Sequence, residues 1–462
     1  MSRGLRIGML ALYIIVVAVA AYGAFTAQLV VSAVTLFVAS LILSAASPRF
    51  GIALLLVVAS TDGFVKRWRP VPEAFVLKDA VVIALILGII VRIGLRKSKA
   101  PLPWDGFGAW SSYIAVLLFS AASTVASPAE ALASLRARGF FSLLYAVGAF
   151  AIDSFARLRA VCALVIGCVS GAAAVGLFQA SFPYIWEQLG PGFVEADRRY
   201  LSFSTVAGLT QAHERAYGCL VDPSALGIAC AYAIMLAFGL LSTSHRASRP
   251  PLILAILVLT AGLVASQTRS AMFGAALGVT AIFVLLVSMR GRRGAAMFVG
   301  VVALIAFAVG TYVLQASNNQ RLGVASNTYA AQTRERSALA VLSGALRRPL
   351  GVGLGATGAG GRFRPGLEND LAVDNLYLAT LYENGFLGLA ALLFVHGSFL
   401  ILAIRRAREG GRAGPIFAAL AGGHLALLGA GAFTQGAFDY APGGIAFWTL
   451  SGALAIPSRY QT

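Results

Sequence analysis

The chain has 462 residues, of which 59% are hydrophobic and only 12% charged, and its mean hydropathy is +0.82. This composition indicates a membrane protein. The formal net charge is +18, but nucleic-acid binding is a poor explanation for it, because no basic domain stands clear of the apolar runs. Such an excess is typical of positive cytoplasmic loops beside anionic lipid.

Apolar runs recur from Ile7 to Ile456, mostly separated by short arginine-bearing connectors. A helix needs roughly 20 apolar residues to cross the hydrocarbon core. Only helices and closed barrels pair every backbone amide there, and these runs lack the alternation of barrel strands. We therefore predict an all-α polytopic membrane protein, a bundle of about 12–14 transmembrane helices forming one domain over residues 1–462.

The predicted spans are Ile7–Phe25, Leu29–Ser47, Phe50–Val65, Phe75–Leu95, Phe107–Val125, Gly139–Ile152, Ala160–Phe182, Ala225–Leu241, Leu252–Ala265, Ala271–Val287, Ala295–Leu314, Phe386–Ile404, Ile416–Phe433 and Gly444–Ile456. The first run has no signal-peptide cleavage site and is predicted as a span. A re-entrant path is the alternative for the third run. We keep the third run as a crossing, because the later connectors then divide clearly into basic ones on one side of the membrane and less basic ones on the other.

With both termini in the cytoplasm, the connectors densest in basic residues fall on the cytoplasmic side. The outside segments are then a loop at 183–224, the turn Ser266–Ser270 and a large loop at 315–385 that bears short helices. Loops this long are usually functional. The capping sequence Ser127–Glu130 further predicts a helix that runs along the interface before its chain enters the membrane.

The first polar pattern is Arg215–Gly218 followed by Asp222–Gly227. Asp222 suits the N-cap of the eighth span and Pro223 its first turn. Arg215 therefore lies just above a helix N-terminus, which is a natural place for an anion. The alternative is an interfacial arginine that extends to lipid headgroups.

The second and third patterns lie in the other outside segments. Arg269 occupies the tight polar turn Ser266–Ser270, where a positive charge goes against the orientation rule and raises the odds of function. Arg347–Gly355 resembles a dinucleotide fingerprint only superficially, because no strand precedes it and no acidic residue follows at the needed distance. It is predicted as a flexible glycine turn that permits close backbone approach to a substrate.

The fourth pattern, Val373–Gly388, carries Asp374 and Glu383 around an apolar helical turn. Nine residues of helix separate these acids by about 13 Å, too far for a carboxylate pair. The alternative to a functional role is helix capping by Asp374 and an exposed Glu383.

Together the four patterns resemble the O-antigen ligase and polymerase superfamily of bacterial membrane glycosyltransferases. The first matches the family's Arg-x-x-Gly and Asn/Asp-Pro-x-x-x-Gly, and the second its Ser-Arg element. The resemblance covers Arg215 to Gly388. The matching segments are Arg215–Gly227, Thr268–Ser270, Pro349–Gly355 and Asn375–Gly388.

The resemblance implies a donor glycan on undecaprenyl pyrophosphate, transferred to a glycan or lipid A-core acceptor at the periplasmic face of the inner membrane. No metal or cofactor is expected. The expected partners are the lipid bilayer and, among polysaccharide-assembly proteins, a chain-length regulator, with no nucleic acid.

Arg215 and Arg269 would hold the pyrophosphate, since guanidinium forks match phosphate oxygens and stabilise a leaving group. Asp374 stands where the ligases usually have His, and is the candidate base. The remaining candidate contacts are His213, Arg347, Arg348, Asn375 and Glu383.

The missing ligase His favours polymerisation of a surface polysaccharide over transfer to lipid A-core. The family's usual Trp is also absent from Ala338–Ala345. A lipid-linked oligosaccharide transporter or flippase is the alternative from another class. It would predict internal repeats and interrupted helices at mid-membrane, whereas the notable charges gather at one face. A non-catalytic scaffold is a third interpretation.

Overall fold

The computed structural model describes residues 29–68, 77–96, 104–123, 128–190, 192–194, 201–206, 209–290, 328–357, 373, 375–409, 411–434, 436–439 and 441–455. Over these ranges the regular structure is helical except for one two-stranded hairpin, which confirms the predicted polytopic helical class. Seven of the described helices are long and apolar enough to cross a membrane. The predicted spans Ile7–Phe25 and Ala295–Leu314 lie outside the described residues.

The first described helices follow the predicted spans to within a few residues. They are α2 (Leu29–Ala46), α3 (Pro48–Trp68), α4 (Leu77–Arg96) and α5 (Trp104–Ala122). Pro48 opens α3, where its missing N–H costs no helical hydrogen bond.

The next stretch lies against α5, and its predicted course along the membrane interface stays a prediction. It consists of α6 (Pro128–Gly139), the 3₁₀ turn η2 (Phe141–Leu143) and α7 (Leu144–Ala151), which run back along α5. Trp110 Nε1 donates to the carbonyl of Ser142 at 2.8 Å, and the Tyr145 hydroxyl donates to the carbonyl of Asp105 at 2.7 Å. Helix α6, η2 and α7 therefore form one broken path beside α5, and the predicted cap at Ser127 lies outside the described residues.

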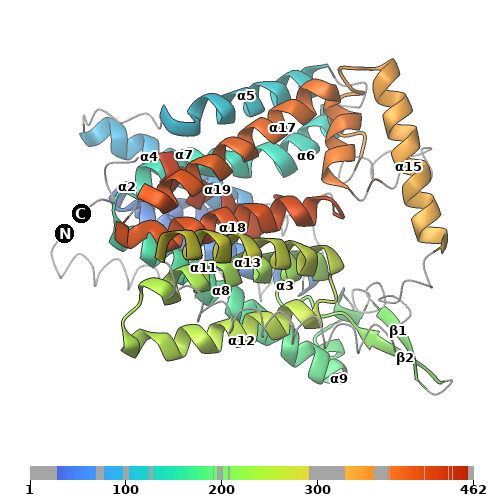
Figure 1. Cartoon of the computed structure of the whole chain (residues 1–462), viewed down its shortest axis with the longest axis horizontal. Coiled ribbons are helices and arrows are strands. Elements are labelled where there is room, and N and C mark those ends of the chain that lie inside the picture. The colour runs from blue at the N-terminus through green and yellow to red at the C-terminus, as the bar shows by residue number, and fades with distance from the viewer. Residues whose placement is uncertain are drawn as a thin grey trace.

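The rest of the chain, from Phe155 onward, supplies the remaining helices and the hairpin (Figure 1). In order they are α8 (Phe155–Ser181), α9 (Pro183–Glu187), β1 (Leu201–Val206), β2 (Leu209–Glu214), α11 (Pro223–Thr243), η3 (Arg246–Ser248), α12 (Arg249–Ala265), α13 (Arg269–Arg290), α15 (Thr328–Arg347), α17 (Leu376–Glu409), η5 (Gly411–Ala413), α18 (Gly414–Gly431), α19 (Gly443–Gly452) and η6 (Ala453–Ala455). The strands β1 and β2 pair antiparallel within the first predicted outside loop.

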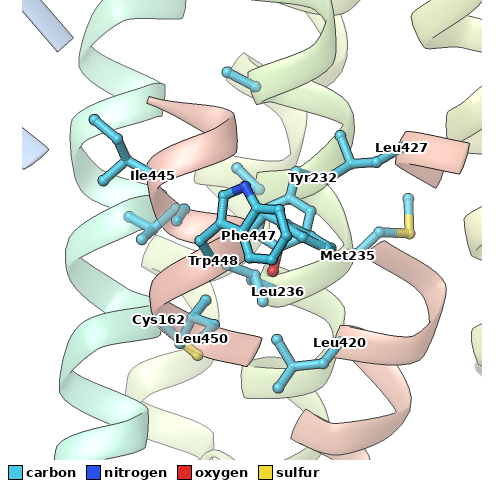
Figure 2. Packing of buried hydrophobic residues seen from close by; sticks show 14 of the residues in the cluster. Cys162, Tyr232, Met235, Leu236, Leu420, Leu427, Ile445, Phe447, Trp448 and Leu450 are labelled. Carbon is cyan, nitrogen blue, oxygen red and sulfur yellow. The ribbon is translucent and has the colours of Figure 1, made fainter. Parts of the chain in front are cut away.

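Helix α11 forms the centre of the bundle, because every residue from Ala225 to Leu240 is buried. Its Tyr232 lies edge-on to Phe447 of α19, which in turn packs edge-on against Trp448 (Figure 2). A helix that is apolar on all sides belongs in such an interior position.

Helices α13 and α18 approach closely through glycines. A Cβ on Gly274 would lie 2.1 Å from the carbonyl oxygen of Ala426, and one on Gly278 would lie 2.5 Å from that of Gly422. Small residues four apart allow this contact between membrane helices, where dispersion must replace the hydrophobic effect.

The bundle has two chemically different ends. Helices α11, α13 and α17 begin at the end where α9, the hairpin and α15 also lie (Figure 1); we call it the loop end. The far end carries basic connectors, where Arg92 donates to the carbonyl of Ala46 and Arg406 pairs with Asp105. These basic connectors and the described parts of the predicted outside segments thus lie at opposite ends of the bundle, and the assignment of each end to a side of the membrane stays a prediction.

Candidate functional site

The turn that follows β2 is held in place by a buried glutamine. The side-chain oxygen of Gln179, in α8, accepts hydrogen bonds from the backbone amides of Tyr217 and Gly218, both at 3.1 Å. Gly218 has φ +56°, and a Cβ there would lie 2.3 Å from the carbonyl oxygen of Ala172. The glycine of the first pattern is therefore required by close packing on α8.

A second clamp comes from Arg67 in the last turn of α3. Its guanidinium donates to the carbonyls of Leu220 and Val221, each at 2.7 Å, and lies 3.7 Å from the ring centroid of Tyr217. Charged donors and ring contact both stabilise such a turn. The surrounding aromatic residues are Phe64, Trp68, Trp186 and Phe193. Sequence reasoning did not identify this role for Arg67, whose partners lie far along the chain.

The structure brings the first and second patterns together. Arg215 Nε donates to the carbonyl of Ser266 at 3.1 Å, and Nη2 donates to Thr268 Oγ1 at 3.2 Å. The amide of Ala216 donates to the carbonyl of Ala265 at 3.0 Å. Arg215 is half-buried, so its guanidinium is oriented by the α12–α13 turn instead of extending freely to solvent.

Two helices begin near the contacts of Arg215. One follows Asp222, whose carboxylate interacts electrostatically with Arg215, and the other begins at Arg269, the residue after Thr268. Arg269 is the first residue of α13 and is exposed. Asp222 caps α11 by accepting from the amide of Ala225 at 2.8 Å. Burial raises the pKa of the Asp222 carboxyl, although its backbone hydrogen bonds and Arg215 act in the opposite direction. Two helix N-termini and two arginines at one end of the bundle favour an anion.

The third pattern is a fixed strap, not the flexible turn that the sequence predicted. Gly353 N donates to the carbonyl of Glu383 at 2.9 Å, and Phe386 N donates to that of Pro349 at 2.9 Å. A Cβ on Gly351, at φ +84°, would lie only 2.4 Å from the Glu383 carbonyl oxygen. The glycines thus permit close approach to the backbone of α17, where the expectation was approach to a substrate.

Glu383 is the second correction, because the alternative of an exposed carboxylate is wrong. Its side chain is 0% exposed and its Oε2 lies 2.6 Å from Arg138 Nη1 of α6. Its Oε1 accepts from the amide and hydroxyl of Thr357 at 2.6 and 2.7 Å. We therefore assign Glu383 to positioning the strap on α17. Arg138 has no local signal in the sequence that would have revealed this contact.

Asn375 caps α17. Its Oδ1 accepts from the amides of Tyr377 and Leu378 at 2.9 and 3.1 Å, and its Nδ2 donates to the carbonyl of Ala432 at 2.7 Å. Helix α17 begins at Leu376, so the asparagine holds the N-cap position. Asp374 lies outside the described residues.

A contact between two aromatic rings connects the segment that carries Arg269 with the segment that carries Asn375. Phe273, one turn into α13 from Arg269, lies edge-on to Phe433 with ring centroids 5.4 Å apart. Phe433 follows Ala432, the residue held by Asn375. The starts of α13 and α17 are therefore connected at the loop end.

The other candidates lie on the periphery or are described only in part. His213 is in β2 opposite Ser202, and only its backbone is described. Arg347 ends α15 and Arg348 follows it, both exposed. Over the described ranges no three His, Cys, Asp or Glu side chains gather as metal ligands.

Comparison with protein families adds one match. The O-antigen ligase family matches over residues 253–393, which include Arg269, the strap and the start of α17. Arg215 and the first pattern precede the matched region. No curated protein matches the chain.

Proposed function

Through its O-antigen ligase domain, residues 253–393, the chain belongs to the O-antigen ligase and polymerase superfamily, and we propose that it is a periplasmic-face membrane glycosyltransferase. Its donor is an oligosaccharide on undecaprenyl pyrophosphate, and its first-choice product is a lengthened surface polysaccharide. The observation that carries this proposal is the junction of Arg215 with the turn that leads into Arg269.

The junction suits a pyrophosphate chemically. A guanidinium stays charged at every relevant pH, and its fork matches phosphate oxygens. Contacts that strengthen as the leaving group gains charge accelerate the reaction. Because the clamps of Arg67 and Gln179 hold the turn of residues 217–221, Arg215 is oriented in advance of any ligand.

The proposed reaction is a direct displacement. The acceptor hydroxyl oxygen forms a bond to the anomeric carbon, the bond from that carbon to the phosphate oxygen breaks, and undecaprenyl pyrophosphate leaves with inversion. The hydroxyl proton passes to the carboxylate of Asp374, the residue before the α17 cap. Neither a metal nor a nucleotide sugar takes part in this scheme.

Transfer to lipid A-core is the second candidate, and the description of the matching family as an O-antigen ligase favours it. The absence of the ligase His, replaced by Asp374, favours polymerisation. The two functions differ in acceptor only, so one assay separates them.

The test uses the purified chain in nanodiscs with an undecaprenyl-pyrophosphate oligosaccharide, with and without lipid A-core, and scores products by gel and mass spectrometry. A ladder of repeats would support polymerisation, and one transfer that requires lipid A-core would support the ligase. Arg215→Ala and Arg269→Ala should each lower the rate about 100-fold or more. Asp374→Asn should also lose activity if Asp374 is the base.

Arg249→Ala is the matched control, because Arg249 is the exposed first residue of α12, as Arg269 is of α13. Arg249 lies at the far end and its loss should leave the rate unchanged. Normal product from both Arg215→Ala and Arg269→Ala would overturn the site. Folded wild-type protein that transfers to neither acceptor would favour the transporter instead.

A further inference from the structure

Helix α15 has three distinct faces. At about 100° per residue, Ser337, Val341 and Ala345 share one side, and all three are buried. This buried face joins Val373, Ala379 and Leu381 in a small apolar cluster. The cluster attaches α15 to the part of α17 that precedes the break at Gly385, where φ is +64°.

After Glu335, a second face of α15 is apolar and exposed over the last turns of the helix. Leu339, Leu342 and Leu346 are 61%, 47% and 77% exposed. Their spacing of three and four residues places them on one stripe, about 120° from the buried side. Exposed leucines in a row are costly in water, so this stripe needs an apolar surface to cover it.

The third face is polar and basic. Arg336, Ala340, Ser343 and Arg347 share it and are all exposed. Arginine on the face beside an apolar stripe is the pattern of helices that lie in a membrane interface, where headgroups are anionic.

The position of α15 agrees with this pattern. Figure 1 shows α15 at the loop end, with its axis directed across the neighbouring spans instead of along them. A helix in this position lies in the plane of the bilayer surface if the spans cross it. A transmembrane path for α15 is excluded by its charges at Glu335, Arg336 and Arg347.

We infer that α15 is an interfacial helix whose leucine stripe is inserted into the lipid leaflet at the loop end, with its basic face toward anionic headgroups. The leaflet is the occupant of the stripe. Because the buried face of α15 packs against the start of α17, the depth of α15 in the leaflet sets the depth of Asn375. This inference rests on the membrane-spanning fold and is independent of the transfer chemistry.

The test is spin labelling of the full chain in vesicles of phosphatidylethanolamine and phosphatidylglycerol. Cys168 and Cys219, which are half-buried, are changed to Ala, and the buried Cys162 and Cys230 are kept. Nitroxides are placed at Leu342→Cys on the stripe and at Ser343→Cys on the polar face. The residues are neighbours in sequence, so the second is a matched control.

Collision with oxygen reports lipid exposure, and collision with a nickel chelate reports water. The label at 342 should favour oxygen, at a depth about 5–10 Å below the headgroup boundary, and the label at 343 should favour nickel. Equal nickel access at both positions would overturn the inference. So would low access to both reagents at 342, which would mean a second copy covers the stripe.

The isoprenoid tail of a lipid-linked substrate is the remaining alternative occupant of the leucine stripe. If the label at 342 becomes lipid-exposed only when undecaprenyl phosphate is added, the stripe binds substrate and the inference fails. No glycan is present in this experiment, so its failure is distinguishable from failure of the proposed transferase.

Discussion

The carboxylate of Glu383 lies 2.6 Å from the guanidinium of Arg138, and both side chains are buried. These residues belong to α17 and α6 and are 245 positions apart in the chain. Loss of either charge would leave the other buried without compensation, which costs about 3–5 kcal/mol. Arg138→Met and Glu383→Gln should each lower the thermal unfolding midpoint in detergent.

The exposed pair Arg405–Glu409, at 2.9 Å, is the control for this prediction. Arg405→Met should leave the midpoint unchanged, since exposed pairs contribute little. The double variant Arg138→Met with Glu383→Met should lose less stability than either single change, because no charge is left unpaired. Single variants with the wild-type midpoint would contradict the assignment of Glu383 to positioning.

The strap gives the second prediction. Gly385→Ala would place a Cβ 2.1 Å from the carbonyl oxygen of Pro349, at φ +64°. Left-handed backbone costs an L-residue about 1–2 kcal/mol even without the clash. Gly385→Ala should therefore lower the unfolding midpoint and the transfer rate together.

Gly344→Ala is the matched control for Gly385→Ala. Gly344 lies inside α15, and the nearest atom to a Cβ there is 3.9 Å away, on the Tyr382 ring. Gly344→Ala should raise helix stability by up to about 1 kcal/mol. An equal fall in both variants would mean that the backbone approach at Gly385 is not the cause.

These contacts show which parts of the molecule were predictable from sequence. Helix bounds depend on local apolar runs, so α8 and α13 lie within a few residues of the predicted spans. Pairing across the bundle depends on partners that no local pattern names. Asp79 in the first turn of α4 is buried and pairs with Arg136 of α6, and no local pattern names that partner.

The candidate site divides in the same way. The caps at Asp222 and near the start of α17 follow from residue type and spacing. The meeting of Arg215 with Thr268 was implied only by family resemblance, because 53 residues separate them. The glycines of the strap were interpreted as flexible, since a sequence does not reveal which backbone lies against them.

Asp439 provides a prediction on pH. Burial raises the pKa of its carboxyl to about 7, with Glu383 acting in the same direction and Arg138 against it. It lies in the turn between α18 and α19, outside the spans. Between about pH 4 and 7 the unfolded chain loses this proton while the folded chain keeps it.

The contribution of Asp439 to stability is therefore complete at low pH and is lost as pH rises toward 7. Asp439→Asn should remove that loss, so its midpoint should fall less than that of the wild type between pH 4.5 and about 7.5. Asp153→Asn, at a partly exposed ion pair of the far end, should keep the wild-type slope. If the unfolding midpoints of the wild type and Asp439→Asn change in parallel with pH, the raised pKa of Asp439 is excluded.

Asn375 links the helix cap to the turn after α18, and this double role gives the last prediction. Asn375→Ala removes an acceptor for the amides of Tyr377 and Leu378 and the donor to Ala432. Loss of an N-cap costs about 0.5–2 kcal/mol, so the midpoint should fall.

Asn375→Asp separates the two contributions. It keeps the cap acceptor, and its negative charge suits the helix N-terminus, but it cannot donate to the Ala432 carbonyl. Its midpoint should lie between those of wild type and Asn375→Ala, while transfer should fall in both variants because the start of α17 is no longer tied to the turn beside α13. If Asn375→Asp keeps full activity, the bond to Ala432 does not position the site, and the asparagine acts as a cap alone.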